Sequence, residues 1–321
     1  MSWVLWCLAG FFALLGAGGA FEALSEARDR VRFPPPGSMV DVGGRRLHLL
    51  CKGTHAGPTV VIEQGAGSPS IFWWPIQDKV ATFSRVCTYD RAGYLWSDPA
   101  ARSRDLEARV EDLHALLAKG KVPGPYIMVG HSFGGPIIRL YARNYPNEVA
   151  GMVLVDTPEE QVILRPSYDD YAKKLGYFAT TFEFAARVGL VRLAAAFLQK
   201  VPDGLDAGAY GALKAGAVRP DFFQAMGDDP VSLSRTPATL RALSGAGSLG
   251  SRPLVVITHC RPFPGPAAAL EDGWLDGQHR LAALSTRGEL VLAEHSNHMI
   301  QSEQPDIVIA AIKRVVALVG N

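Results

Sequence analysis

The stretch "PYIMVGHSFGGPIIRLYARNYP", residues 125–146, decides the fold. It begins as a short apolar run typical of a buried strand and continues with apolar residues at helical spacing. Between the two lies Gly130-His131-Ser132-Phe133-Gly134, which matches G-x-S-x-G in the strand-to-helix context that this motif requires. Such a sharp turn strains the serine backbone and points free N–H groups of the helix N-terminus at it. Ser132 is therefore predicted to be a nucleophile; the alternative is a purely structural turn.

Strand-like and helix-like patterns alternate on both sides of this stretch. An antiparallel hairpin is expected around Gly43-Gly44. Further strands are expected at 59–67, 85–90, 151–157, 253–260 and 288–296, and helices at 105–120, 134–145 and 305–319. A hairpin followed by alternating strands and helices predicts an α/β fold with a mainly parallel sheet covered on both faces.

The interval 158–250 interrupts the alternation with Ala, Leu and Phe at helical spacing, which predicts an inserted helical cap. Four segments are therefore expected. They are 1–37 (membrane anchor or signal, with a proline-rich linker), 38–157 (core, first part), 158–250 (cap) and 251–321 (core, second part).

The N-terminal run "WVLWCLAGFFALLGAGGAF", residues 3–21, contains no charge and has the length that a bilayer core demands. We expect a single membrane anchor with a soluble catalytic domain. A signal peptide cleaved after Ala20, leaving a secreted or periplasmic protein, is one alternative, and a buried helix is another. Arg28, Arg30 and Arg32 follow the run and favour a cytoplasmic position for that end.

Composition restricts the partners. The 321 residues include 32 basic and 31 acidic side chains, so no overall field favours nucleic acid, and a small-molecule substrate is expected. The oligomeric state stays open. The four cysteines are Cys7, Cys51, Cys87 and Cys260, without a C-x-x-C pair.

A serine nucleophile needs a base, and the sequence offers eight histidines. His298, in "HSNHMIQSEQP", follows the last predicted strand and occupies the last place in the order serine, acid, histidine. His295 is the rival. The two also form an H-x-x-H pair, but no third ligand stands out, so neither a metal nor another cofactor is expected.

The acid must lie near the sheet edge to orient the histidine. Asp156 ends the strand "GMVLVD" and is the preferred candidate. Asp272 and Asp276 follow the next predicted strand at a greater distance along the chain, and Glu159 and Glu160 are further alternatives.

Two backbone N–H groups must stabilise the oxyanion of an acyl-transfer reaction. Phe133, directly after the serine, and Ala66, in the loop "QGAG" (64–67), are the expected donors; the alternative for this loop is a plain turn. Trp73 and Trp74 follow that loop, and with the apolar cap they predict a pocket for an apolar acyl or alcohol group. The alternative is that they only pack the cap against the core.

With these residues in place, the chain resembles the α/β-hydrolase superfamily over about residues 38–320. The resemblance rests on the segments "QGAG", "YDRAGYLWSD" (89–98), "GHSFGG", "YARNYP", "GMVLVD" and "SNHMIQSEQP". It implies an eight-stranded sheet in the order 1-2-4-3-5-6-7-8. The strands of Cys51 and Cys87 would then be neighbours, which allows a disulfide, although reduced cysteines remain an alternative.

The chain departs from the family pattern at several positions, and one of them bears on which reaction is expected. Gln64 and Asn297 stand where the family usually has histidine and glycine. Asp156 matches the acid position of the haloalkane-dehalogenase-like branch, which uses an aspartate nucleophile, whereas Ser132 favours ester hydrolysis. Asp90 and Arg91 are expected to brace loops. The resemblance implies a serine hydrolase that cleaves carboxylic esters through an acyl-enzyme. An acyltransferase and a non-catalytic binding protein are the alternatives.

Overall fold

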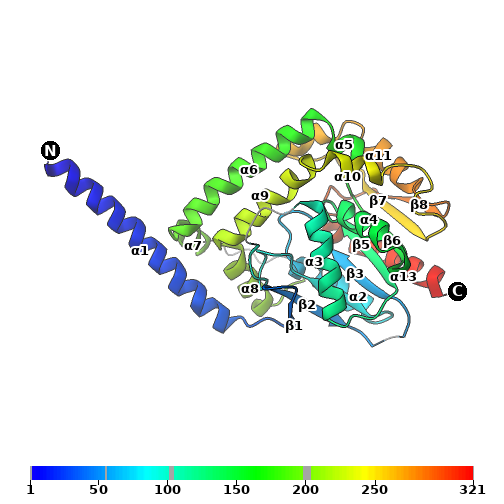
Figure 1. Cartoon of the computed structure of the whole chain (residues 1–321), viewed down its shortest axis with the longest axis horizontal. Coiled ribbons are helices and arrows are strands. Elements are labelled where there is room, and N and C mark those ends of the chain that lie inside the picture. Colours follow the sequence, from blue (N-terminus) through cyan, green and yellow to red (C-terminus); the bar gives the residue numbers. More distant parts are fainter. Residues whose placement is uncertain (1, 55, 101–104, 198–203, 321) are drawn as a thin grey trace.

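A computed structural model describes residues 2–54, 56–100, 105–197 and 204–320. Its centre is an eight-stranded sheet in the order β1-β2-β4-β3-β5-β6-β7-β8 (Figure 1), which confirms the predicted fold class. The strands are β1 (Ser38–Asp41), β2 (Arg46–Lys52), β3 (Thr59–Glu63), β4 (Val86–Tyr89), β5 (Tyr126–His131), β6 (Val149–Val155), β7 (Leu254–His259) and β8 (Gly288–Ala293). The pairs β1–β2 and β2–β4 are antiparallel and the others are parallel.

Helices cover both faces of the sheet. One layer holds α3 (Leu106–Lys119), α4 (Gly134–Asn144) and α11 (Trp274–Ala282), and the other holds α2 (Trp74–Val80) and α13 (Pro305–Gly320). Successive residues of β5 alternate between these layers, because side chains of a strand point to opposite faces. Met128 packs in the first core, and Ile127 and Val129 pack in the second.

A helical segment lies between β6 and β7, in the interval where the sequence predicts a cap. It consists of α5 (Glu160–Ile163), α6 (Pro166–Arg187), α7 (Leu190–Ala195), α8 (Ala207–Ala217), α9 (Pro220–Ser234) and α10 (Pro237–Leu243). We call α6–α9 the cap; α6 and α9 pack side by side (Figure 1). The short α10 packs on α4 instead, and its Leu240 and Leu243 join the core of that layer.

A buried charge network joins the cap to the core. Asp229 of α9 is fully buried and pairs with Arg91 (Nη2–Oδ2 2.8 Å) and Arg109 (Nη1–Oδ1 3.1 Å). The Tyr94 hydroxyl also donates to Asp229 Oδ2, at 2.6 Å. Arg91 also pairs with Glu63, the last residue of β3, with Nη1 and Oε1 2.6 Å apart. Two arginines and two carboxylates therefore compensate one another where water is excluded.

Replacing Asp229 by alanine is expected to lower the free energy of unfolding by about 3–5 kcal/mol, because it leaves buried arginines without a compensating charge. Asp170→Ala, at an exposed position of α6, should cost less than about 1 kcal/mol. Chemical denaturation of the full chain in detergent would measure both changes. Equal losses in the two variants would contradict the assigned role of the network.

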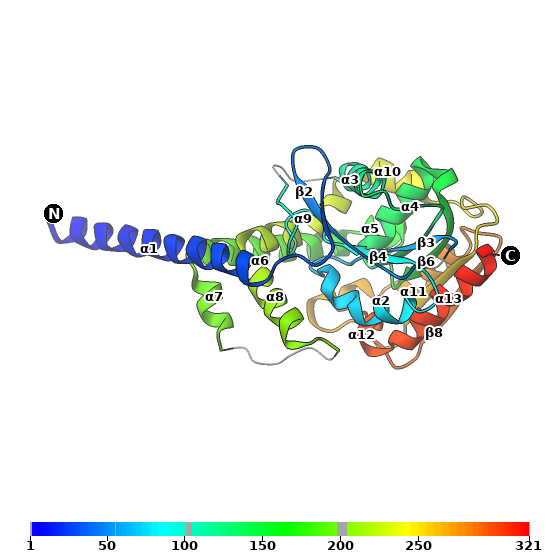
Figure 2. The same ribbon diagram turned by 90° about the horizontal axis from the view of Figure 1, so that it is seen from below.

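The chain begins with one long helix, α1 (Ser2–Arg32), whose N-terminal part projects away from the body (Figures 1 and 2). Within the described residues, it is the one helix long and apolar enough to cross a membrane, with a mean hydropathy of 1.9 over its most apolar window. That window is not buried in the protein.

Cys51 of β2 and Cys87 of β4 form a disulfide. The two residues lie directly opposite each other in the antiparallel pair, with their Cα atoms 4.0 Å apart. Of the alternatives that the sequence leaves open, the disulfide is therefore the one observed. Cys7 and Cys260 are free and exposed.

Candidate active site

Ser132 lies at the turn between β5 and α4 with φ of +49°, a left-handed conformation that costs energy for any residue other than glycine. Small neighbours make this turn possible. A β-carbon at Gly134 would lie 2.4 Å from the Glu63 carbonyl oxygen, and one at Gly135 would lie 2.1 Å from the Thr157 side chain. Gly134 and Gly135 thus let α4 start directly against the ends of neighbouring strands.

Ser132, His298 and Asp156 form a continuous chain of hydrogen bonds. His298, in the loop between β8 and α12 (Ile300–Glu303), has its Nε2 at 2.8 Å from Ser132 Oγ and its Nδ1 at 2.7 Å from Asp156 Oδ2. If Nδ1 carries the proton, it donates to the carboxylate and leaves Nε2 free to accept from the serine. This is the geometry that a base-activated nucleophile requires.

Asp156 is held rigidly at the end of β6. It is fully buried, and its Oδ1 accepts from Trp274 Nε1 at 3.0 Å and from Thr258 Oγ1 and the His259 amide at 3.2 Å. Burial alone would raise the pKa of Asp156, but hydrogen bonds from His259 and His298 hold it well below its usual range. The group is therefore a carboxylate at neutral pH.

The rival residues lie elsewhere. Asp272 pairs with Arg165, and its side chain is 89% exposed. Asp276 and His295 are exposed as well. Glu159 pairs with Arg280, and Glu160 pairs with Arg139. Of the candidate acids and bases, the structure brings only Asp156 and His298 to Ser132.

A second histidine, which the sequence pattern did not single out, shares the acid. His259, the last residue of β7, has its Nδ1 at 2.6 Å from Asp156 Oδ2 and its Nε2 at 3.3 Å from Glu271 Oε2. Because carboxylate oxygens only accept, two such neighbours stabilise the form of the histidine that carries both protons. Burial opposes this charge, but the bonds to Asp156 and Glu271 outweigh it and raise the pKa of His259. The sequence offered one indication of this contact: His259 and Asp156 both stand at the carboxyl ends of predicted strands.

His259→Gln is expected to destabilise the protein more at pH 6 than at pH 9. A raised folded-state pKa contributes stability that is fully present below the unfolded value of about 6.5 and is lost as the pH rises through the folded value. The loss at pH 6 should be about 1–3 kcal/mol, as for a hydrogen bond to a charged group. Thermal unfolding of the full chain would measure it, with exposed His295→Gln as control; a pH-independent loss would contradict the assignment.

His131 supports the base from the opposite side. It is buried, and its Nε2 donates to the His298 carbonyl oxygen at 3.0 Å. Burial and the nearby His298 lower its pKa to about 3, so the ring is neutral at physiological pH. His131 thereby fixes the loop that carries His298, a contact that its place beside Ser132 in the sequence did not suggest.

A cavity of about 70 Å³ opens beside Ser132 and His298. Residues of both the core and the cap line it, among them Ala66, Phe133, Tyr168, Tyr171, Phe263 and Trp274. Its volume is below the roughly 300–1,000 Å³ of small-molecule pockets, so a larger substrate must displace cap side chains. Aromatic side chains make up much of this lining.

Trp73 and Trp74 do not line this cavity, so the prediction that they form the substrate pocket is corrected. Trp73 is fully buried on the opposite face of the sheet, in the layer of α2 and α13. Trp74 stacks on Trp96 with ring centroids 5.9 Å apart. Both follow the loop of Ala66 closely in sequence, but η1 (Ser70–Trp73) turns the chain away from Ser132.

Arg91 braces the loop that contains Ala66. Its guanidinium donates to the carbonyl oxygens of Gln64 and Gly65, both at 2.7 Å. In a trans peptide the C=O and N–H groups point in opposite directions, so holding the Gly65 carbonyl turns the Ala66 N–H away from Arg91. Arg91 also lies over the Phe133 ring, 5.2 Å from its centroid. One buried cation thus holds the peptide before Ala66 and packs on the ring of Phe133, the two residues predicted to donate to an oxyanion.

Asp156, His259 and His298 place three potential metal-ligand atoms within 4.8 Å of one another. In each contact a histidine nitrogen faces a carboxylate oxygen at 2.6–2.7 Å, which is the distance of a charge-assisted hydrogen bond. Protons therefore account for the arrangement, and a metal there would have to displace His298 from its orientation toward Ser132.

A family model for the α/β hydrolase fold matches residues 58–237, more than half of the chain. Together with the sheet order and the strand–serine–helix turn, this match shows that the chain belongs to the α/β-hydrolase superfamily. An uncharacterized Bacillus subtilis protein, YqjL, is 33% identical over 115 residues, which cover 36% of this chain and 46% of that relative. The chain thus matches less than half the length of this curated relative.

Solved structures with low sequence identity share the fold. A thermophilic esterase from Thermogutta terrifontis superimposes with a TM-score of 0.63 at 17% identity, covering 88% of this chain and 98% of the esterase. A bacterial virulence factor described as a membrane phospholipase A gives 0.60 at 18% identity over 100% of both chains. The part of this chain that the match covers includes α1.

Proposed function

We propose that the protein is a serine hydrolase that cleaves carboxylic esters with an apolar acyl or alcohol group. The observation that carries this proposal is the hydrogen-bond chain from Ser132 through His298 to Asp156, which opens into an apolar cavity. A strained serine at a helix N-terminus, a histidine and a buried carboxylate are the parts that acyl transfer needs. The serine also excludes the covalent chemistry of an aspartate nucleophile at this position.

The reaction follows from the positions of these groups. Ser132 Oγ attacks the ester carbonyl carbon while His298 Nε2 takes its proton, and Asp156 stabilises the resulting imidazolium. The amides of Ala66 and Phe133 stabilise the oxyanion. The bond to the alcohol oxygen then breaks, and His298 returns the proton to the leaving alcohol. Water attacks the acyl-enzyme by the same steps in reverse, which releases the acid and restores Ser132.

A series of p-nitrophenyl esters of increasing acyl length tests this function on the full chain in detergent. The rate of hydrolysis is expected to be higher for longer acyl chains than for acetate, because the cavity lining is apolar. Product analysis with added alcohol separates hydrolysis from acyl transfer. No turnover of any ester would contradict the proposal, and acyl ester formation in preference to free acid would favour the acyltransferase.

We further propose that α1 anchors the protein in a membrane with the catalytic body on the oxidising side. Its uncharged residues 3–21 span about 28 Å at 1.5 Å per residue, which matches a bilayer core. The Cys51–Cys87 disulfide favours a body outside the cytoplasm, since such bonds are rare in reducing compartments. Arg28, Arg30 and Arg32 favour the opposite orientation under the positive-inside rule, in which the nearby acidic residues count for little, so the disulfide alone carries this part of the proposal.

Thiol labelling of the denatured full chain tests this topology. Without reduction only Cys7 and Cys260 should react with a maleimide reagent, and reduction should add Cys51 and Cys87. Cys260→Ser serves as the control, because it should remove one label under both conditions. Reaction of all four cysteines before reduction would remove the disulfide on which the proposed topology rests.

A further inference from the structure

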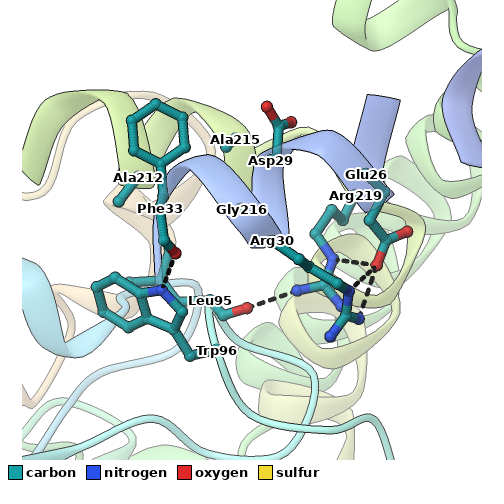
Figure 3. A pocket seen from close by; sticks show the side chains of 10 residues that line it. All are labelled: Glu26, Asp29, Arg30, Phe33, Leu95, Trp96, Ala212, Ala215, Gly216 and Arg219. Atoms are coloured by element: carbon teal, nitrogen blue, oxygen red, sulfur yellow. Dashed lines mark hydrogen bonds and ion pairs between the residues drawn. The ribbon is translucent and has the colours of Figure 1, made fainter. Parts of the chain in front are cut away.

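The charged end of α1 is clamped to the body. Glu22 pairs with Arg192 of α7 at 2.7 Å, and Glu26 pairs with Arg219, which precedes α9, at 3.0 Å. Figure 3 shows this junction: Arg219 also donates to the Leu95 carbonyl oxygen at 2.5 Å. Cap, core loop and α1 therefore meet at one place.

The turn between α6 and α7 lies beside the uncharged part of α1. A β-carbon at Gly18 would be 2.4 Å from the Val188 carbonyl oxygen, and one at Gly189 would be 2.8 Å from the Phe21 ring. Gly18 precedes the first charged residue, Glu22, by about one helical turn. When residues 3–21 cross a bilayer, this turn therefore lies at the depth of the membrane interface.

Several apolar side chains near this turn are exposed, and no other described residue covers them. Leu190 and Leu193 of α7 are 58% and 53% exposed, and Phe197, just after that helix, is 85% exposed. On α6, Tyr177, Phe178 and Phe184 are also exposed. Aromatic and aliphatic side chains of this kind are typical of membrane interfaces.

The exposed apolar side chains of α1 favour lipid, and not a second copy of the chain, as the partner that covers this surface. Leu5, Trp6, Phe12 and Leu14 are all more than half exposed and, at 100° per residue, point in several directions around the helix. A second copy of the chain would cover one stripe, whereas lipid surrounds a helix completely. The exposed side chains of α7 continue this lipid-facing surface.

Helix α6 connects the exposed apolar side chains near α7 with the cavity beside Ser132. Tyr168 and Tyr171, in its first turns, line the cavity beside Ser132, and its C-terminal end reaches α7 and α1. Figure 1 shows α6 running across the direction of α1, as a helix lying along the membrane plane would. Both ends of α6 therefore lie near the level of the interface.

We propose that α1 and the exposed apolar side chains of α6 and α7 form one membrane-contacting surface, which supplies Ser132 with long-chain esters from the lipid phase. The supply of substrate rests on the proposed hydrolase function; the membrane contact does not. The apolar lining of the cavity and its small volume fit a site that a lipid chain opens by displacing cap side chains.

Depth-dependent quenching tests the contact without any measurement of activity. Leu193→Cys, made in a background of Cys7→Ala and Cys260→Ser, carries an environment-sensitive fluorophore on the full chain in phosphatidylcholine–phosphatidylglycerol vesicles. A lipid spin-labelled near the top of its acyl chain should quench this probe at least about twofold more than a probe at Arg287→Cys, an exposed position beside β8. Equal quenching at the two positions would overturn the proposal.

A substrate comparison tests the supply of lipid. The double variant Leu190→Asp with Leu193→Asp should keep the wild-type rate on soluble p-nitrophenyl acetate. It should lose about tenfold or more on a long-chain ester embedded in vesicles. The matched control is Leu318→Asp, at an exposed leucine of α13. Wild-type rates on both substrates would overturn the proposal. Absence of any Ser132-dependent hydrolysis would overturn the hydrolase function instead and leave the quenching result to decide the contact.

Discussion

Ser132→Ala is expected to lower kcat for p-nitrophenyl butyrate by roughly 10⁴- to 10⁶-fold while the chain remains folded. The hydroxyl is the only group of Ser132 that reaches His298 Nε2, at 2.8 Å, and alanine keeps the rest of the turn. Ester turnover by the full chain in detergent measures the loss, and thermal unfolding verifies the fold.

The matched control is Ser302→Ala, at an exposed serine of α12, which should keep wild-type turnover. Retained esterase activity in the Ser132 variant would show that another group is the nucleophile.

Asp156→Asn is expected to reduce kcat by about 10⁴-fold, because the amide cannot hold His298 in the tautomer that accepts the serine proton. Asp156 accepts from two histidine rings, a tryptophan and a threonine. The asparagine side chain has one N–H₂ group in place of an acceptor oxygen, so some of these donors would lose their acceptor. Asp272→Asn, on an exposed side chain, should change kcat by less than about twofold. A large loss in Asp272→Asn and not in Asp156→Asn would move the acid to the loop after β7.

The sequence could predict what depends on local pattern and chain order. The Ser132 turn follows from glycines that must sit where strand and helix meet, and the structure finds these contacts at Gly134 and Gly135. Asp156 and His298 were predicted because carboxyl ends of parallel strands meet at one edge of the sheet. The structure brings both residues to Ser132.

Other features depend on register and docking, which a single sequence does not encode locally. His259 reaches Asp156 because β7 pairs with β6 in register, and Glu271 reaches His259 through a loop that folds back over 12 residues. Tyr168 and Tyr171 enter the cavity because α6 packs against α9. Trp73 was misplaced because nearness in sequence to Ala66 does not determine which face of the sheet a side chain meets.

The most direct measurement of the central claim is the site of labelling by a fluorophosphonate, which reacts with activated serines. Intact-mass analysis of the labelled full chain should show one adduct, and peptide mapping should place it on Ser132. His298→Ala should abolish the adduct, because the serine then has no base. Labelling at another residue, or undiminished labelling of Ser132 in His298→Ala, would contradict a nucleophile activated by His298.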